Sequence, residues 1–143
     1  MPSARSDSGG KEGLRLFMKE NVKFYICPIC GNIIGAINGD MSRVYCCGKP
    51  IQQLTANTTD AAVEKHLPVY EKVEDEIVVK VGSVEHPMEK EHYIMWIAQV
   101  TENKTTRVKL YPEQATETRF SYIPGSTIYA YCNKHGLWKS IVE

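Results

Sequence analysis

Alternating apolar and polar positions in the second half of the chain are typical of short β-strands. The clearest case has Ile77, Val79 and Val81 on one face, with different residues between them. Strands of this kind are expected at residues 77–81, 92–100, 107–111, 118–122 and 127–132. Asn103 and Lys104 mark the tip of a hairpin between the second and third of them. Because no segment has a convincing amphipathic-helix pattern, this part of the chain is predicted to be an antiparallel β-sandwich.

Two of these expected strands have faces that the sequence assigns. The longest is expected to carry the following residues on one face: His92, Ile94, Trp96, Ala98 and Val100. The last strand is expected to carry Ile128, Ala130 and Cys132 on the face opposite Tyr129 and Tyr131.

Composition divides the chain into three predicted units. Residues 1–18 are polar and rich in Ser and Gly, which predicts a disordered leader. Residues 19–55 contain few large apolar side chains, so they are predicted to form a small domain held together by a metal. Residues 56–143 contain the sandwich, and the polar stretch 55–64 is typical of a linker.

The leader allows two further interpretations. Arg5 and Arg15, with the neighbouring serines, weakly resemble an organellar transit peptide, but Asp7 and Glu12 argue against that interpretation. Met18 is an alternative start of translation.

Charge and cysteine content narrow the class of protein. The 143 residues carry 17 basic and 17 acidic side chains, and this balance argues against binding to nucleic acid or to anionic membranes. The longest apolar run, 93–98, is far shorter than the roughly 20 residues of a membrane-spanning helix, which excludes a transmembrane protein. Five cysteines, an odd number, and no secretory signal place the protein in a reducing cytoplasm.

Four of the cysteines form a metal-binding pattern. Cys27 and Cys30 form a C-P-x-C turn, and the adjacent pair Cys46 and Cys47 follows sixteen residues later. Four thiolates favour tetrahedral zinc or iron. Ligation by two adjacent residues requires a tight turn, and the resulting distortion favours iron over an ordinary zinc ribbon. A purely structural zinc knuckle and a vicinal disulfide are the alternatives.

Two glycines are expected to help this first metal site. Gly31 and Gly48 each follow a cysteine, and they are expected to let backbone amides turn toward the sulfur atoms.

The remaining cysteine accompanies all the histidines of the chain at expected strand ends and loops, where a sandwich can gather ligands: His66, His86, His92, Cys132 and His135. Imidazoles with one thiolate favour Zn, Cu, Fe or Ni. A blue-copper site is one alternative, but it uses only two histidines and normally an axial Met, and no Met follows His135. The other alternative is that these histidines bind no metal.

The two sets together resemble desulfoferrodoxin, the two-iron class of superoxide reductase, over residues 19–143. The matching motifs are the four cysteines with their doublet, Glu64-Lys65-His66-x-Pro68, His86-Pro87, His92, and Cys132-Asn133-x-His135-Gly136-Leu137-Trp138. The resemblance implies a mainly β fold in which a rubredoxin- or desulforedoxin-like domain precedes an immunoglobulin-like antiparallel sandwich.

The resemblance also implies the sites and the activity. One iron is expected on the four N-terminal cysteines; a second is expected on four equatorial imidazoles and an axial thiolate: His66, His86, His92, His135 and Cys132. Glu64 and Lys65 are expected beside the open sixth position. The implied reaction reduces superoxide to hydrogen peroxide without dismutation, in a homodimer that takes electrons from rubredoxin or a similar donor.

Three other functions compete with this interpretation. The chain can be a non-enzymatic electron carrier with two metal centres, a superoxide dismutase, or a zinc-stapled interaction module. Hydrogen peroxide formed with consumption of an external electron distinguishes the reductase from the carrier, and oxygen evolution reveals a dismutase.

Overall fold

The computed structural model describes residues 22–143. The expected leader, 1–18, and the first three residues of the expected metal domain, 19–21, lie outside the described residues. Within residues 22–143 the structure is almost entirely β, and its one helix, α2 (Val63–His66), is a single turn. No helix in this part of the chain has the length and apolar character needed to cross a membrane.

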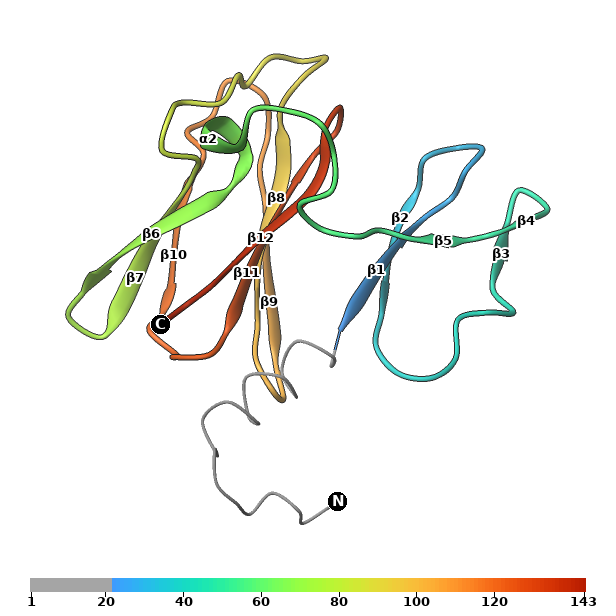
Figure 1. The fold of residues 1–143 in the computed structure, drawn as a ribbon, viewed down its shortest axis with the longest axis horizontal. Helices are drawn as coiled ribbons and strands as arrows, with labels where there is room; N and C mark the ends of the chain where they lie inside the picture. The colour runs from blue at the N-terminus through green and yellow to red at the C-terminus, as the bar shows by residue number, and fades with distance from the viewer. Residues whose placement is uncertain (1–21) are drawn as a thin grey trace, which may run out of the picture.

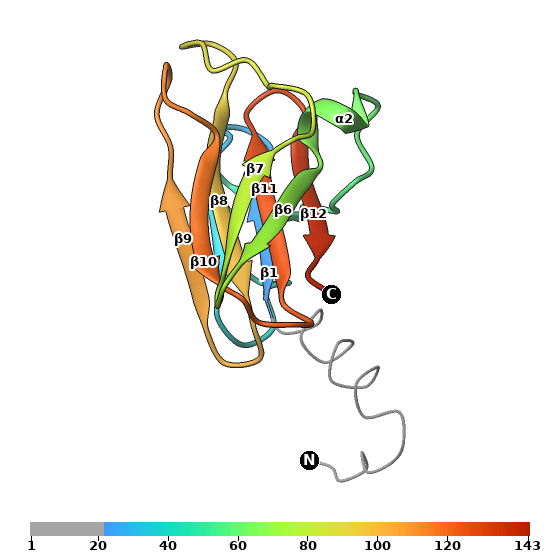
Figure 2. The ribbon, with the colours of Figure 1, turned by 90° about the vertical axis from the view of Figure 1, so that its left-hand side faces the viewer.

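Two antiparallel sheets form the predicted sandwich (Figures 1 and 2). The first has the order β10-β7-β6, with bounds β6 (Pro68–Val73), β7 (Glu76–Val81) and β10 (Glu117–Ser121). The second has the order β12-β11-β8-β9, with bounds β8 (Ile94–Val100), β9 (Thr105–Lys109), β11 (Thr127–Cys132) and β12 (Gly136–Ile141). Three strands facing four in this order make an immunoglobulin-like Greek-key sandwich, as expected. The strands β6 and β12 were not among the predicted ones.

The core between the sheets confirms one of the two face assignments. Ile77 and Val79 of β7 are fully buried there, and they meet Ile128, Ala130 and Cys132 of β11. Tyr129 and Tyr131 lie on the opposite face of β11, in a second apolar cluster. The period of two therefore holds along the whole of β11.

The face predicted for the longest strand holds for Trp96, Ala98 and Val100 but is wrong for Ile94, because β8 contains a bulge. Tyr131 pairs with Trp96, but the next residue of β11, Cys132, pairs with Ile94, so that Met95 is the extra residue. Ile94 consequently points into the core between the sheets, whereas Trp96 points to the other side. His92 lies before the strand, in an isolated bridge with Glu89, and not within it.

The metal domain is a small β structure beside the four-stranded sheet (Figure 1). Its sheet has the order β2-β1-β5, with bounds β1 (Lys23–Ile26), β2 (Ile33–Ala36) and β5 (Gln52–Gln53), and its hairpin joins β3 (Tyr45–Cys46) and β4 (Lys49–Pro50). Phe24 of β1 is buried against the sandwich, with ring centroids 5.0 Å from Trp96 and 5.1 Å from Tyr129. The face of β8 that carries Trp96, which points away from the core between the sheets, thus provides the surface on which the metal domain packs.

The expected linker is hydrogen-bonded along β12. The Asn57 amide N–H donates to the Leu137 carbonyl at 2.9 Å. The Asn57 side chain accepts the Lys139 N–H at 2.9 Å and donates to the Lys139 carbonyl at 3.2 Å. These bonds extend the edge of the sheet and fix the path of the chain between the metal domain and α2.

Truncating the aromatic contact between the two parts is expected to be costly. Phe24→Ala should lower the free energy of unfolding by about 3 kcal/mol, because it leaves a cavity against Trp96 and Tyr129. Denaturant unfolding followed by tryptophan fluorescence measures the loss. Tyr25→Ala, on the other face of β1, is the control and should cost much less; equal costs would contradict the packing role.

Candidate metal centres

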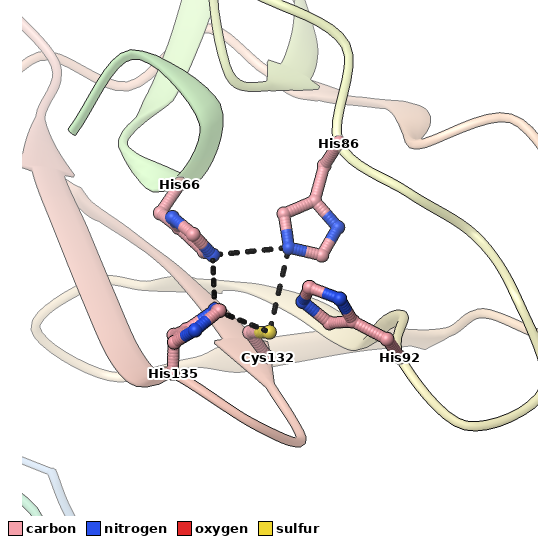
Figure 3. A group of neighbouring side chains, drawn as sticks. All are labelled: His66, His86, His92, Cys132 and His135. Carbon is pink, nitrogen blue, oxygen red and sulfur yellow. Dashed lines mark hydrogen bonds between the residues drawn. The ribbon is translucent and has the colours of Figure 1, made fainter. Parts of the chain in front are cut away.

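All five donors predicted in the C-terminal part meet at one end of the sandwich (Figure 3): His66, His86, His92, Cys132 and His135. Their donor atoms lie within 4.8 Å of one another. They come from α2, from the β7–β8 connection, from the residue two before β8, from the end of β11 and from the β11–β12 turn. The sandwich therefore gathers ligands that are up to 69 residues apart.

Pro68 and Gly136 set the points at which the chain leaves α2 and β11, and these points place His66 and His135. Pro68 disfavours helix at Leu67, whose ψ is 124°, so α2 stops at His66 and β6 begins at once. In the four-stranded sheet, Gly136 has φ +82° and allows the tight turn between β11 and β12 that carries His135 beside Cys132.

Hydrogen bonds from the far ring nitrogen aim two of the imidazoles. The Nδ1–H of His66 donates to the Ala62 carbonyl at 2.7 Å, and that of His86 donates to the Pro87 carbonyl at 2.6 Å. Both rings therefore present Nε2 to the centre of the group. His135 presents Nδ1 instead, 3.0 Å from His66 Nε2, and His92 has a buried Nε2 with no hydrogen-bond partner among the described residues.

The contacts between these rings require a cation. The Nε2 atoms of His66 and His86 lie 3.0 Å apart, although each ring has already used its one proton on a carbonyl. Burial lowers the pKa of both residues, that of His86 to about 4, so neither is protonated at neutral pH. Two lone pairs this close repel each other, and a shared metal ion removes this repulsion. The same ion would give a partner to the orphaned Nε2 of His92.

The sulfur atom of Cys132 completes the donor set. It is fully buried, 3.4 Å from His86 Nε2 and 3.9 Å from His135 Nδ1. Burial raises the pKa of this thiol, against opposing hydrogen bonds from the backbone amides of Lys134 and His135. A bound cation is the interaction that makes the thiolate favourable in such a place. Four neutral imidazoles and one thiolate fit iron, whereas a blue-copper site uses only two imidazoles.

One residue that supports the site was quoted in the sequence motif without a role. The indole of the buried Trp138 stacks on the His66 ring, with centroids 5.1 Å apart and planes 20° apart. Its Nε1–H donates to the His135 carbonyl at 3.0 Å. Trp138 thereby holds two of the donors, and only the fold reveals this contact.

Glu64 and Lys65 lie on α2 beside His66, with their side chains exposed to solvent. The carbonyl of Glu64 accepts the Val84 amide at 2.9 Å and the Ser83 hydroxyl at 3.4 Å. Lys65 is close enough for its positive charge to contribute to the lowered pKa of His66, after burial and the charge of His135. Within residues 22–143, no hydrogen bond joins either side chain to the five donors.

Gly82 determines how closely α2 approaches the segment after β7. A Cβ atom at this position would lie 2.5 Å from the Glu64 carbonyl oxygen and 3.0 Å from the carbonyl carbon of Lys65. Because both of those atoms belong to the backbone, they cannot move aside without shifting α2. Only glycine therefore lets the turn with Glu64, Lys65 and His66 sit where it does.

The four N-terminal cysteines also meet, with sulfur atoms within 4.8 Å of one another: Cys27, Cys30, Cys46 and Cys47. All of them are free thiols, and the sulfurs of Cys46 and Cys47 are 4.0 Å apart, so the vicinal disulfide is not formed. The sulfur of Cys27 accepts the amides of Ile29 and Cys30, both at 3.4 Å. Backbone amides therefore do turn toward a sulfur, as expected, while the amide of Gly31 itself donates to the Cys27 carbonyl at 3.1 Å.

The doublet forms the tight turn that the sequence predicted. Cys46 ends β3, and Cys47 and Gly48 form a two-residue hairpin turn with φ values of 55° and 75°. Left-handed backbone is unfavourable for a cysteine, so a specific role must offset it. In this conformation both sulfurs face the same site.

The pKa values of the thiols show that the four sulfurs do not all ionise without a cation. The amides of Cys30 and Ile29 are the main causes that lower the pKa of Cys27, to about 6, although burial opposes them. Contacts with Cys27 and Cys30 raise the pKa of Cys46 to about 12. Four thiolates can coexist here only around a metal ion, for which iron and zinc both have the required preference.

Comparison with known proteins identifies the family. The family model described as desulfoferrodoxin matches residues 58–141, more than half of the chain. A desulfoferrodoxin from Syntrophotalea carbinolica is 48% identical over 124 residues, which cover 86% of this chain and 98% of the relative. The chain belongs to the desulfoferrodoxin family. A desulfoferrodoxin from Desulfarculus baarsii is 43% identical over 125 residues, with the same coverage of 86% and 98%.

A solved structure agrees with this assignment to the desulfoferrodoxin family. The superoxide reductase from Treponema pallidum is 32% identical, with a TM-score of 0.66, over 83% of this chain and 98% of that one. The two donor groups of the present chain correspond to the two iron sites of the family, so its cofactors are two iron ions per chain.

Filling the space at Gly82 is expected to disturb the second centre. Gly82→Ala should destabilise the protein by about 1–3 kcal/mol and reduce iron in the histidine site, since the new methyl group displaces α2. Iron per chain and thermal unfolding measure the two effects. Gly35→Ala is the control, because its Cβ would meet only the Phe24 side chain at an ordinary 3.7 Å; normal iron content in the Gly82 variant would contradict the account.

Proposed function

We propose that this protein is a superoxide reductase, which reduces superoxide to hydrogen peroxide by one electron without dismutation. The observation that carries the proposal is the single group of four imidazoles and one buried thiolate at the edge of the sandwich. The relative from Treponema pallidum, which is named a superoxide reductase, supports it over most of both chains. We further propose that the chain acts as a cytoplasmic homodimer.

The donor residues determine the charge and access of the centre. Iron bound there supplies the electron that superoxide takes up. The four imidazoles are neutral and the thiolate of Cys132 carries one negative charge, so the donors leave a divalent ion with a net positive charge, which favours an anionic substrate. His66, His86 and Cys132 are buried, whereas His92 and His135 are partly exposed and leave a side open to water.

Lys65 and Glu64 are the residues to which we assign roles beside that open side. The ammonium group of Lys65 attracts the superoxide anion and guides it to the centre. The carboxylate of Glu64, on the same turn, would be available to bind the iron when no superoxide is present. The reaction takes one electron and two protons for each superoxide, and the exposure of this turn lets water supply the protons.

The four cysteines serve electron supply in this proposal. Cys30 and Cys47 are exposed, so a rubredoxin-like donor can approach this iron closely. We assign residues 19–55 to this relay domain and 56–143 to the reductase domain, after the leader 1–18. The relay is dispensable for the reaction itself, because every donor of the second centre lies within the reductase domain.

The stoichiometry of the products tests the proposal. Reduced protein is mixed with pulses of superoxide, and hydrogen peroxide and oxygen are measured. A reductase gives one hydrogen peroxide per superoxide and no oxygen. One oxygen for every two superoxide ions would identify a dismutase, and no acceleration of superoxide loss would leave the electron carrier and the interaction module.

Separate removal of each centre is expected to have different effects. Cys132→Ser should abolish superoxide reduction and leave the iron on the four cysteines in place. Cys47→Ser should remove that iron and keep the second-order rate with superoxide, when a chemical reductant supplies the electrons. Rate and iron content are measured on the same samples, and full activity in the Cys132 variant would refute the assignment.

Loss of the lysine charge is expected to slow the encounter with superoxide. Lys65→Ala should lower the second-order rate by about tenfold and flatten its dependence on ionic strength. Lys72→Ala, near the far end of β6, removes an equal charge and should leave the rate unchanged. Pulse radiolysis at several salt concentrations measures both, and equal rates in the two variants would exclude steering by Lys65.

A further inference from the structure

Unlike His66 and His86, His92 has a ring that no hydrogen bond holds among the described residues. His66 and His86 are each held by a hydrogen bond from Nδ1 to a carbonyl. Among the described residues, no hydrogen bond from the His92 ring is found, and its buried Nε2 is without a partner. The direction of this ring therefore depends on the backbone that carries it, together with edge contacts to His86 and His135 at centroid distances of 4.8 and 5.0 Å.

The backbone of His92 belongs to a small turn. His92 and Glu89 exchange two backbone hydrogen bonds, at 3.0 and 3.1 Å, and form an isolated bridge. These bonds give the turn its shape, but they do not fix it to the rest of the site, since both partners belong to the turn itself. A second set of contacts is needed to set His92 against the donors of β11.

Asn133 supplies that second set. Its Oδ1 accepts the Tyr93 amide at 3.0 Å, and its Nδ2 donates to the Glu91 carbonyl at 3.0 Å. Its own amide donates to the Tyr93 carbonyl at 3.3 Å. The side chain thus bonds to the residues on both sides of His92, in the manner of a short β-ladder.

The position of Asn133 in the chain links this clamp to two other donors. It follows Cys132 directly and precedes His135 by two residues. Any movement of the His92 turn relative to Asn133 therefore changes the distances from His92 to both of them. One amide side chain joins the segments that carry three of the five donors.

We propose that Asn133 is a positioning residue, which sets His92 against Cys132 and His135 before the metal binds. A centre that is assembled in advance holds its ion more tightly, because binding then does not have to order the loop. The proposal deepens the proposed function, since it concerns the same centre. It can be tested without superoxide, so its failure and the failure of the reductase assignment are distinguishable.

The chain offers a matched control in Asn57. That side chain also accepts one backbone amide and donates to one backbone carbonyl, both of Lys139, but Lys139 is not adjacent to any of the five metal-binding residues. Asn57→Gly keeps the positive φ of 63° accessible and removes the side chain. It should lower the thermal midpoint about as much as Asn133→Ala.

Two readouts separate positioning from general stability. In metal-free full-length protein, hydrogen exchange of the Tyr93 amide is followed by NMR. In iron-loaded protein, loss of iron to a chelator is followed by the thiolate-to-iron absorption that is missing in Cys132→Ser. Asn133→Ala should speed exchange at Tyr93 and speed iron loss by about 10–100-fold, while Asn57→Gly should change neither by more than twofold.

Further variants keep the test decisive. Asn133→Asp retains the acceptor for Tyr93 and should keep that amide protected. Asn133→Ser replaces the alanine variant if the latter fails to fold, with the same expected outcome. Wild-type iron loss and wild-type Tyr93 exchange in the alanine or serine variant would overturn the proposal, as would equal acceleration in Asn57→Gly.

Discussion

The repulsion between unshared electron pairs at the end of the sandwich is the constraint on which the structure depends. The neutral rings of His66 and His86 each donate their one N–H, at Nδ1, to a backbone carbonyl. Their unprotonated Nε2 atoms then lie 3.0 Å apart. The buried thiol of Cys132 and the orphaned nitrogen of His92 add to the same problem. A metal ion shared by these atoms removes the repulsion, and without one the facing lone pairs raise the free energy of this end of the fold.

The sandwich makes that arrangement possible because it keeps distant segments in register. The bulge in β8 matters most, since it places Ile94 in the core below the centre and turns Trp96 outward. The outward face receives Phe24 of the metal domain. A single extra residue thus serves both the reductase core and the attachment of the domain with the four cysteines.

Much of the fold and of both centres follows from the sequence, for identifiable reasons. The period of two in β7 and β11 reflects burial of one face, and the spacing of Cys27, Cys30, Cys46 and Cys47 reflects coordination of one ion. The strand β6 was missed because most of its residues are exposed or partly exposed, which weakens the alternation. The bulge at Met95, the packing of α2 on Gly82 and the bonds of Asn133 involve partners far along the chain, so no local pattern encodes them.

The central claim is that both donor groups hold iron, and the metal content of the protein tests it most directly. Iron and zinc per chain are measured by elemental analysis, on protein produced with ample iron and purified without oxygen. The account predicts two irons per chain, one for the four cysteines and one for the four histidines with Cys132. Zinc alone would contradict it, and would make the protein an interaction module stapled by metal rather than a redox enzyme.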